Sequence, residues 1–542
     1  MPILIHILTA CKRWFAVAWF CLIAVVPALC AEKAGATLAI IPKPARMEVH
    51  RGVFVVGAGT KIYLEGEDGG VRRVGENLST LLSSLVGRTV PVQVADGIVR
   101  HRNSIHLSLK APTALGPEGY ELRVSPDAIQ ISAATAAGLF YGVQTLRQML
   151  PPEFESHAAG EKRGEVPCVY IQDSPRFRWR GLMLDCSRTF QSVDYLQHTL
   201  DRMALYKLNV LQLHLTGDQG WRLEIKKYPE LTAQGARFPA KYAEPPSHQG
   251  FYTQEQMRDL VTYAARRHIT IVPEIEMPGH SLAALSVLPQ LSCTGGPFEI
   301  FPYFKGPGIV QEILCAGKEE TFVFLGDVLD EVMAVFPSEF VHIGGDEAPK
   351  TRWKACPHCQ KRIRDEGLKN EAELQSWFNR RVEKMLAAKG RRLIGWDEIL
   401  EGGLSPTAAV MSWRGMAGGV AAAKAGHDVV MSPTSHCYFD YKYEAINSAR
   451  AFSFDPVSGL TAEAAGRVLG LQANFWSHID REPELVDAQL FPRLLALAER
   501  GWSPAGGRDW PDYRSRAQAH LLQLRRLGIH YHTGDIEESA GK

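Results

Sequence analysis

The sequence lacks an excess of charge of either sign. Its 542 residues include 60 Lys and Arg against 59 Asp and Glu, so the formal net charge is +1. A partner that attracts the whole surface electrostatically, such as nucleic acid or an anionic membrane, is therefore not expected. With 46% hydrophobic and 22% charged residues, the composition also lacks the bias of a disordered, collagen-like or coiled-coil protein.

Apolar runs long enough to span a membrane are lacking after residue 31. Before that point, Lys12 and Arg13 precede an uncharged apolar run over Trp14–Ala31, which contains Pro27 and several small residues. This order predicts a signal peptide over residues 1–31, with a retained membrane anchor as the alternative. We favour cleavage and expect an exported protein, periplasmic or secreted, with no stable membrane insertion.

The chain after the leader also lacks an even number of cysteines. Seven of the ten lie there: Cys168, Cys186, Cys293, Cys315, Cys356, Cys359 and Cys437. An oxidising compartment permits disulfides, and we expect one between Cys293 and Cys315, which bracket the Gly- and Pro-rich loop Thr294–Val310. The Cys356-Pro-His-Cys359 motif has no second CxxC, so a local disulfide or plain loop cysteines are favoured over a redox or zinc site.

Short alternating strands dominate residues 36–166, where we expect a small α+β domain. A hairpin turn is predicted at Ser125–Asp127, and a linker over Pro151–Gly164. The domain carries no catalytic constellation. Its expected strands are Val53–Val56, Lys61–Leu64, Val90–Val94, Ser104–Leu109, Tyr120–Val124 and Ala128–Ser132, and its expected helices are Gly70–Leu85 and Thr135–Leu150.

From Phe177 onward, apolar runs alternate with amphipathic segments, as in parallel βαβ units. We expect a (β/α)8 TIM barrel over residues 175–505, followed by a C-terminal helix and tail over 506–542. A doubly wound sheet is the alternative, but no GxGxxG or P-loop marks its switch point. The expected strands are Gly181–Asp185, Val210–Leu215, Thr270–Glu274, Phe340–Gly344, Arg392–Trp396, Ala409–Trp413, Asp428–Ser432 and Gly470–Phe475. The expected helices are Val193–Lys207, Thr253–Arg267, Lys318–Phe336, Glu371–Lys389 and Ala488–Arg500.

Polar and aromatic residues recur at the C-terminal ends of these strands. In a barrel those ends share one rim, where active sites form. Core packing explains single members of the set but gives no reason for the repetition. The residues are Asp185, Arg188, His214, Asp218, Glu274, Glu276, His280, Asp346, Glu347, Trp396, Asp397, Trp413, Arg414, Tyr438, Asp440, Trp476 and His478.

Carboxylates together with tryptophans indicate a carbohydrate site, because indole faces stack on sugar rings and carboxylates accept hydrogen bonds from hydroxyl groups. An ordinary retaining glycosidase holds two carboxyl groups ~5–5.5 Å apart across the scissile bond. Asp346 and Glu347 are adjacent, so on an extended backbone their side chains would diverge. A substrate that supplies its own nucleophile removes this difficulty.

The segment His342–Glu347 (HIGGDE) resembles the signature of glycoside hydrolase family 20, the β-N-acetylhexosaminidases. The resemblance covers almost the whole chain after the leader, in order. It includes Gly138–Leu146 (GLFYGVQTL), Trp179–Arg188 (WRGLMLDCSR), His214–Arg222 (HLTGDQGWR), Pro273–His280 (PEIEMPGH), Gly395–Asp397 (GWD), Met411–Trp413 (MSW), Tyr438–Asp440 (YFD) and Ala473–Trp476 (ANFW).

The resemblance implies a role for each residue of the site. Glu347 would be the general acid and base, Asp346 would orient the 2-acetamido group, and Tyr438 would donate a hydrogen bond to the acetamido oxygen. The implied substrate-binding residues are Arg188, Trp396, Trp413, Asp440, Trp476 and His478, and the implied supporting residues are Asp218, Glu276 and His280.

Three positions depart from the family pattern. Two acids commonly follow the His-Leu-Ser/Thr segment that here begins at His214, but Gly217 stands in the first place, so support for His280 is either absent or rebuilt through Asp218. His478 stands where an acid commonly holds the far sugar hydroxyls, which leaves the preference between GlcNAc and GalNAc open. Thr189 replaces a common histidine, a change that we expect to be minor.

The expected function is therefore an exo-acting, retaining β-N-acetylhexosaminidase that works through an oxazolinium intermediate on N-acetylhexosamine-containing oligosaccharides or glycoconjugates, without a cofactor. Two alternatives are a metal-dependent barrel hydrolase using His214, His280 and His342, and a non-catalytic sugar-binding protein. The natural glycan stays open among chitin fragments, cell-wall muropeptides and host glycans.

Overall fold

The computed structural model describes residues 38–95, 102–151, 163–506 and 509–536. The predicted signal peptide over residues 1–31 and most of the predicted linker lie outside these ranges. Within the described ranges, no helix combines the length and the apolar character needed to cross a membrane.

The N-terminal part is a seven-stranded mixed sheet with the strand order β1-β7-β5-β6-β4-β2-β3. Two helices pack on it, α1 (Gly69–Val86) and α2 (Ala136–Met149). Asp68 and Thr135 begin these helices, because their side chains accept hydrogen bonds from backbone N–H groups of the first turn. The strands are β1 (Arg46–Val56), β2 (Lys61–Glu65), β3 (Val92–Ala95), β4 (Ser104–Ser108), β5 (Tyr120–Val124), β6 (Ala128–Ala133) and β7 (Gly164–Asp173).

Strand β7 was not predicted from the sequence, although it joins the edge strand β1 to β5. Pro167 and the polar stretch before Gly164 hid it. Only the segment from Val169 to Asp173 pairs with β5, so Pro167 lies beyond the end of that ladder. A proline has no backbone N–H, and it is tolerated there because β5 does not extend far enough to need a hydrogen bond from it.

Eight parallel strands close into a barrel, as the sequence predicted. Nearly every residue of these strands is buried, as expected for strands covered on both faces. The strands are β8 (Trp179–Asp185), β9 (Val210–His214), β10 (Thr270–Glu274), β11 (Phe340–His342), β12 (Arg392–Trp396), β13 (Ala409–Ser412), β14 (Val429–Met431) and β15 (Val468–Phe475).

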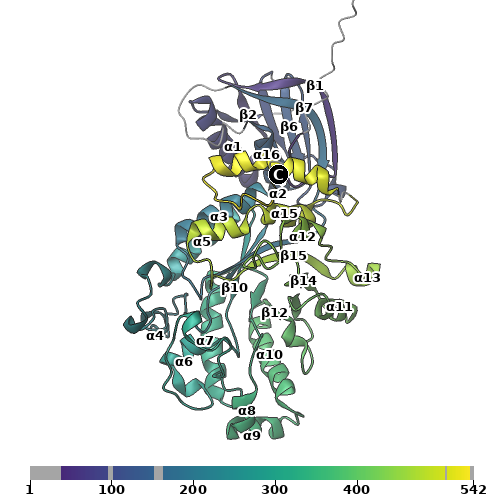
Figure 1. Ribbon diagram of the computed structural model, residues 1–542. Helices are drawn as coiled ribbons and strands as arrows, with labels where there is room; N and C mark the ends of the chain where they lie inside the picture. Colours follow the sequence, from purple (N-terminus) through teal and green to yellow (C-terminus); the bar gives the residue numbers. More distant parts are fainter. Residues whose placement is uncertain (1–37, 96–101, 152–162, 507–508, 537–542) are drawn as a thin grey trace, which may run out of the picture. The chain divides into compact units, whose positions relative to one another are not determined.

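Helices cover the outside of the barrel, with α5 against β10 and α10 against β12 (Figure 1). The longer helices are α3 (Val193–Leu205), α5 (Gln254–Ala265), α7 (Glu319–Val335), α10 (Glu371–Ala387) and α15 (Arg493–Trp502). The shorter helices are α4 (Glu230–Ala233), α6 (Leu282–Val287), α8 (Thr351–Ala355), α9 (Pro357–Asp365), α11 (Ala417–Lys424), α12 (Ser448–Ser453), α13 (Ala462–Ala465) and α14 (Pro483–Leu490).

The predicted helix Ala488–Arg500 is confirmed only from Arg493 onward, where α15 begins. Its first residues form the end of α14, with Phe491 and Pro492 between the two helices. A proline inside a helix removes one backbone hydrogen bond and clashes with the preceding turn, so the helix breaks at this point.

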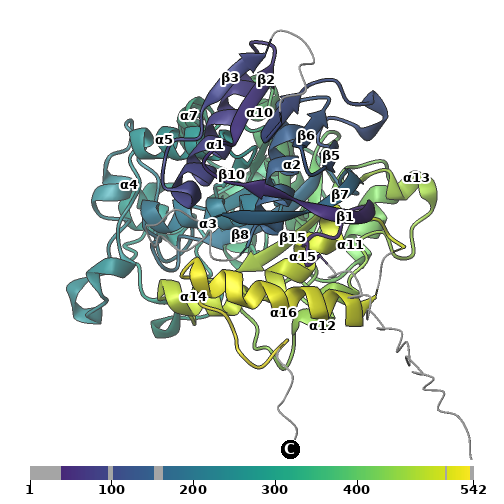
Figure 2. The ribbon, with the colours of Figure 1, turned by 90° about the horizontal axis from the view of Figure 1, so that it is seen from above.

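The last helix, α16 (Trp510–Arg526), lies alongside α15 (Figure 2). Arg516 on α16 pairs with Glu499 on α15 at 2.6 Å, and both side chains are buried. A second buried ion pair joins the sheet to the barrel, where Lys207 Nζ lies 3.1 Å from Asp173 Oδ2. Buried pairs of this kind are costly to break, so they fix the register between elements distant in the sequence.

The predicted Cys293–Cys315 disulfide is wrong, because all seven cysteines in the described part of the chain are free thiols. The Cys293 sulfur lies 3.8 Å from that of Cys359, and the Cys315 sulfur lies 3.7 Å from that of Cys356. Nor do Cys356, which precedes α9, and Cys359, in the first turn of α9, form a local disulfide, because both are free thiols.

Candidate active site

A cavity of about 230 Å³ opens at the C-terminal ends of the barrel strands. Ten of the twelve predicted site residues line it, and the other two, Asp218 and Glu276, lie behind His280 and Asp346. The lining residues are Arg188, His280, Tyr303, Asp346, Glu347, Trp396, Trp413, Tyr438, Asp440, Tyr441, Trp476 and His478.

A sharp turn after β11 presents both acidic side chains to the cavity. Gly344 and Gly345 have positive φ angles of 66° and 92°, and Glu347 follows with φ 44°. A Cβ on Gly344 would meet Glu276 Oε2 at 1.7 Å, so no other residue fits there. The expectation that Asp346 and Glu347 diverge assumed an extended backbone. The left-handed conformation of Glu347 instead lets both side chains line one cavity.

His280 lies between these two carboxyl groups. Its Nε2 is 3.6 Å from Asp346 Oδ2 and 3.5 Å from Glu347 Oε2. On the other side of the ring, Nδ1 lies 2.8 Å from Asp218 Oδ2. Burial alone would lower the pKa of His280, but the Asp218 carboxylate and the two acids of the cavity raise it well above its usual value. The ring is therefore an imidazolium that faces the site.

Asp346 forms the floor of the cavity as a buried carboxylate. Burial alone would raise its pKa, but the hydrogen bond and the charge of His280 keep the pKa below its ordinary value. Among the described residues, Asp346 Oδ1 has no hydrogen-bond partner. Neighbouring Glu276 behaves oppositely, because burial and the charge of Asp346 raise its pKa well above normal. Asp346 thus offers the cavity a buried carboxylate with an acceptor oxygen that no described residue occupies.

Tryptophans form the walls, each fixed by a hydrogen bond or by stacking. Trp396 donates from Nε1 to Glu274 at 2.8 Å, and Trp413 donates from Nε1 to Glu398 at 2.8 Å. The Arg188 guanidinium lies 4.7 Å from the ring centre of Trp476. All three tryptophans line the cavity and offer apolar indole surface to a flat, C–H-rich ligand such as a sugar ring, with Arg188 covering one face of Trp476.

Tyr438 and Asp440 are positioned by the last strand. Phe439, between them, donates its backbone N–H to Asn474 of β15, and Asn474 donates in turn to the Cys437 carbonyl. Burial raises the pKa of Tyr438 well above its usual value, so its hydroxyl stays protonated and can donate a hydrogen bond. Burial also raises the pKa of Asp440 to about 7.

A buried network lies beneath the cavity. Glu274 contacts two histidines, His214 Nδ1 at 3.0 Å and His342 Nδ1 at 3.2 Å. His280 belongs to a different cluster, paired with Asp218. The three histidines of the metal-dependent alternative therefore do not converge on one point, although His214, Glu274 and Glu276 do bring ligand atoms together.

Two family models match this chain. Glycosyl hydrolase family 20, catalytic domain, matches residues 177–505, and glycosyl hydrolase family 20, domain 2, matches residues 37–174. The chain belongs to glycosyl hydrolase family 20. It is therefore a glycoside hydrolase.

Relatives within family 20 are similar over most of the chain. A β-hexosaminidase of Porphyromonas gingivalis is 42% identical over 93% of this chain, and the match spans 65% of that protein. A β-N-acetylhexosaminidase of Cellulomonas fimi is 33% identical, covering 91% of this chain and 96% of the relative. The solved structure of the Streptomyces coelicolor family 20 β-N-acetylhexosaminidase has a TM-score of 0.81 at 34% identity, covering 92% and 98%.

The first departure from the family 20 pattern is resolved by the structure. Asp218 supplies the carboxylate for His280, so the dyad is rebuilt one position later. Gly217 lies against the neighbouring loop, where a Cβ would come within 2.6 Å of Ser187 Oγ. An acidic side chain at this position would have to displace the Ser187 hydroxyl.

The second departure, His478, lies at the rim among aromatic side chains. Its ring centre is 4.7 Å from that of Tyr303, which comes from the loop between Cys293 and Cys315. Burial lowers the pKa of His478, so the neutral ring predominates near neutrality. Where the family commonly places an acid, this family 20 member therefore presents an uncharged surface.

Sequence reasoning missed three residues of the site. Tyr441 directly follows the Tyr438–Asp440 motif, and Glu398 directly follows Gly395–Asp397, so neighbouring motifs could have indicated both. Burial and the Asp346 charge raise the pKa of Glu398 to about 8. Tyr303 follows no strand, and only the folded loop brings it to the cavity.

Proposed function

We propose that this family 20 enzyme is an exo-acting, retaining β-N-acetylhexosaminidase that uses the substrate's 2-acetamido group as nucleophile. One observation carries the proposal. Asp346 is a buried carboxylate beside Glu347, and its Oδ1 has no partner among the described residues. That oxygen suits the N–H of an acetamido group. The names of the relatives, β-hexosaminidase and β-N-acetylhexosaminidase, support the same activity.

In the first step, the acetamido carbonyl oxygen attacks the anomeric carbon while the glycosidic C–O bond breaks. Glu347, on the open side of the cavity, transfers its proton to the departing oxygen. Tyr438 donates its O–H to the acetamido oxygen and orients it. The acetamido group and the sugar together form a fused oxazolinium ion. The carboxylate of Asp346 stabilises the positive charge that develops at the N–H of this ion.

In the second step, water attacks the anomeric carbon from the face that the leaving group vacated. Glu347, now a carboxylate, takes a proton from this water. The C–O bond to the acetamido oxygen breaks, and the acetamido group is restored. Two inversions at one carbon give overall retention.

The size of the cavity supports action on a terminal sugar. About 230 Å³ is below the ~300 Å³ at which pockets for drug-sized ligands begin, and fits a single sugar unit. Arg188 lies at its inner wall and Asp440 Oδ1 has no partner within the described ranges, so both are placed to bind ring hydroxyls.

A panel of aryl β-glycosides tests this proposal. We expect hydrolysis of the GlcNAc and GalNAc compounds, and hydrolysis of the glucoside slower by at least about 10³-fold, because it lacks the internal nucleophile. Proton NMR of the GlcNAc reaction should show the β-anomer first. A glucoside cleaved as fast as the GlcNAc compound would refute the mechanism. The ratio of GlcNAc to GalNAc rates measures the preference imposed at His478.

Replacing Asp218 by asparagine should move the acid limb of the kcat/KM profile to higher pH. Without that carboxylate the pKa of His280 falls, and the ring becomes neutral near pH 7. Asp346 then loses its cation, and its pKa rises. Since Asp346 acts as a carboxylate, activity should need a pH higher by about one unit. An unchanged limb would show that His280 does not act through its charge. Asp330→Asn, at an exposed ion pair, is the matched control.

We also propose export. The basic residues Lys12 and Arg13 and the apolar run Trp14–Ala31 support a cleaved signal peptide, and a periplasmic or secreted enzyme would meet its glycans directly.

A further inference from the structure

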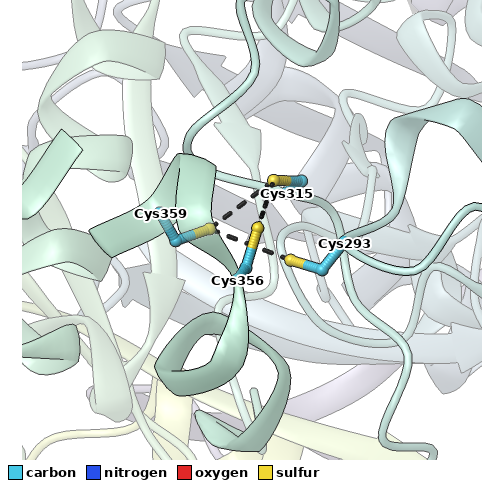
Figure 3. A group of neighbouring side chains, drawn as sticks. All are labelled: Cys293, Cys315, Cys356 and Cys359. Carbon is cyan, nitrogen blue, oxygen red and sulfur yellow. Dashed lines mark hydrogen bonds between the residues drawn. The ribbon is translucent and has the colours of Figure 1, made fainter. Parts of the chain in front are cut away.

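Four cysteines from three separate segments of the chain meet at one point outside the residues that line the sugar pocket. Cys293 follows the turn Pro289–Leu291, Cys315 precedes α7, and Cys356 and Cys359 lie at the start of α9. Three of the four are buried, and Cys293 is partly exposed. Figure 3 shows their side chains pointing toward one another. All four sulfur atoms lie within 4.8 Å of one another.

We propose that these four thiolates bind one structural zinc ion. The Cys315 sulfur lies 3.7 Å from that of Cys356 and 3.5 Å from that of Cys359, which is in turn 3.8 Å from that of Cys293. Zn–S bonds of about 2.3 Å place the sulfurs of a regular tetrahedron about 3.8 Å apart. A disulfide would give each sulfur a single partner, whereas Cys315 and Cys359 each have two at this spacing.

The chemistry of the donors favours zinc over a harder ion. Thiolates are soft ligands, which select zinc rather than magnesium or calcium, and four protein ligands make a closed structural site. Cys356-Pro-His-Cys359 supplies one pair of ligands. Cys293 and Cys315, far apart in the sequence, supply the second pair.

Hydrogen bonds and close backbone packing hold the segments that carry the four cysteines next to one another. Cys315 donates its N–H to the Leu291 carbonyl at 2.8 Å. Lys318 donates from Nζ to the Ser292 carbonyl at 2.7 Å, beside Cys293. A Cβ on Gly317 would meet the His358 carbonyl carbon at 2.2 Å, so the segment after Cys315 lies directly against the CxxC turn.

The zinc would tie together two loops that serve the sugar pocket. The loop between Cys293 and Cys315 carries Tyr303, which lines the pocket and contacts His478. The segment that holds Cys356 follows Glu347 through the short helix α8. Trp353 on α8 also donates from Nε1 to the Leu314 carbonyl at 2.9 Å. The ion would therefore fix both ends of the Tyr303 loop to the segment after the proposed general acid.

Metal analysis of the purified full chain, prepared without chelators, tests the proposal independently of the sugar chemistry. We expect about one zinc ion per chain in the wild type. The Cys359→Ser variant should lose most of this zinc, and the control Cys168→Ser should keep the wild-type zinc content. Cys293→Ser, at the partly exposed ligand, covers the case in which Cys359→Ser does not fold. Cobalt added to the metal-free wild type should give the d–d spectrum of a tetrahedral tetrathiolate.

Thiol counting separates the zinc site from the competing disulfides. After denaturation, chelation and alkylation without reductant, mass spectrometry should find all four cysteines alkylated. A chain that carries Cys293–Cys359 and Cys315–Cys356 disulfides, contains iron instead, or binds no zinc in titration with Zn²⁺ alone would overturn the proposal. Because disulfides form in oxidising compartments, an exported chain makes a pair of disulfides the main alternative to a zinc site.

Discussion

Replacing Glu347 by glutamine lowers kcat on an aryl β-GlcNAc compound by about 10²–10⁴-fold, equivalent to about 3–5 kcal/mol of transition-state stabilisation. Glutamine keeps the size and the hydrogen bonding of the side chain but has no proton to give. Glu347 lies 3.5 Å from His280 Nε2 and keeps 35% of its side chain exposed, so it can reach a departing oxygen on the open side of the cavity. Steady-state kinetics at saturating substrate measures the loss.

The leaving group provides an internal control for this variant. An aryl group that departs as a stable phenolate needs no protonation. On such a substrate, Glu347→Gln should therefore slow the first step much less than on a substrate with a poor leaving group. Binding of free GlcNAc should stay near the wild-type value, which separates loss of chemistry from loss of fold. A variant with wild-type turnover on a poor leaving group would favour the non-catalytic, sugar-binding alternative.

The repetition of elements in the sequence was enough to predict the barrel. All eight strands were located, Thr270–Glu274 and Arg392–Trp396 to the residue, because parallel strands buried on both faces are continuous apolar runs. Two prolines misled the prediction, in opposite directions, whereas Pro273 inside β10 did not. Pro167 hid a real strand, and Pro492 divided a predicted helix.

The site was predicted where strand ends determine position, and was missed where a loop folds back. Ten residues next to strand ends converge on the cavity as expected. Tyr303 has no such anchor, and its place depends on the path of the whole loop between Cys293 and Cys315. For the same reason no sequence pattern indicates that these two cysteines meet Cys356 and Cys359, since sequence separation says little about contacts between long loops.

Replacing Asp346 by asparagine should lower kcat on 2-acetamido substrates by about 10²–10³-fold, or about 3–4 kcal/mol, while KM changes far less. The amide keeps the shape of the side chain but removes the negative charge that, in the proposed mechanism, would face the oxazolinium N–H. The effect is large because Asp346 is buried, and a charge in a water-excluded site is weakly screened.

The surrounding charges sharpen this test. His280, paired with Asp218 at 2.8 Å, carries a positive charge next to Asp346. In the Asp346→Asn variant, no negative charge at residue 346 separates this imidazolium from the cation that develops on the substrate. Asp440→Asn is the matched control: it changes another acid of the same cavity, one whose proposed role is to bind ring hydroxyls, so KM should rise more than kcat falls. If Asp346→Asn kept wild-type kcat on the GlcNAc compound, the acetamido group would not be the nucleophile. Selective loss on 2-acetamido substrates, with the Asp440 variant affected mainly in KM, is the pattern that only substrate-assisted catalysis predicts.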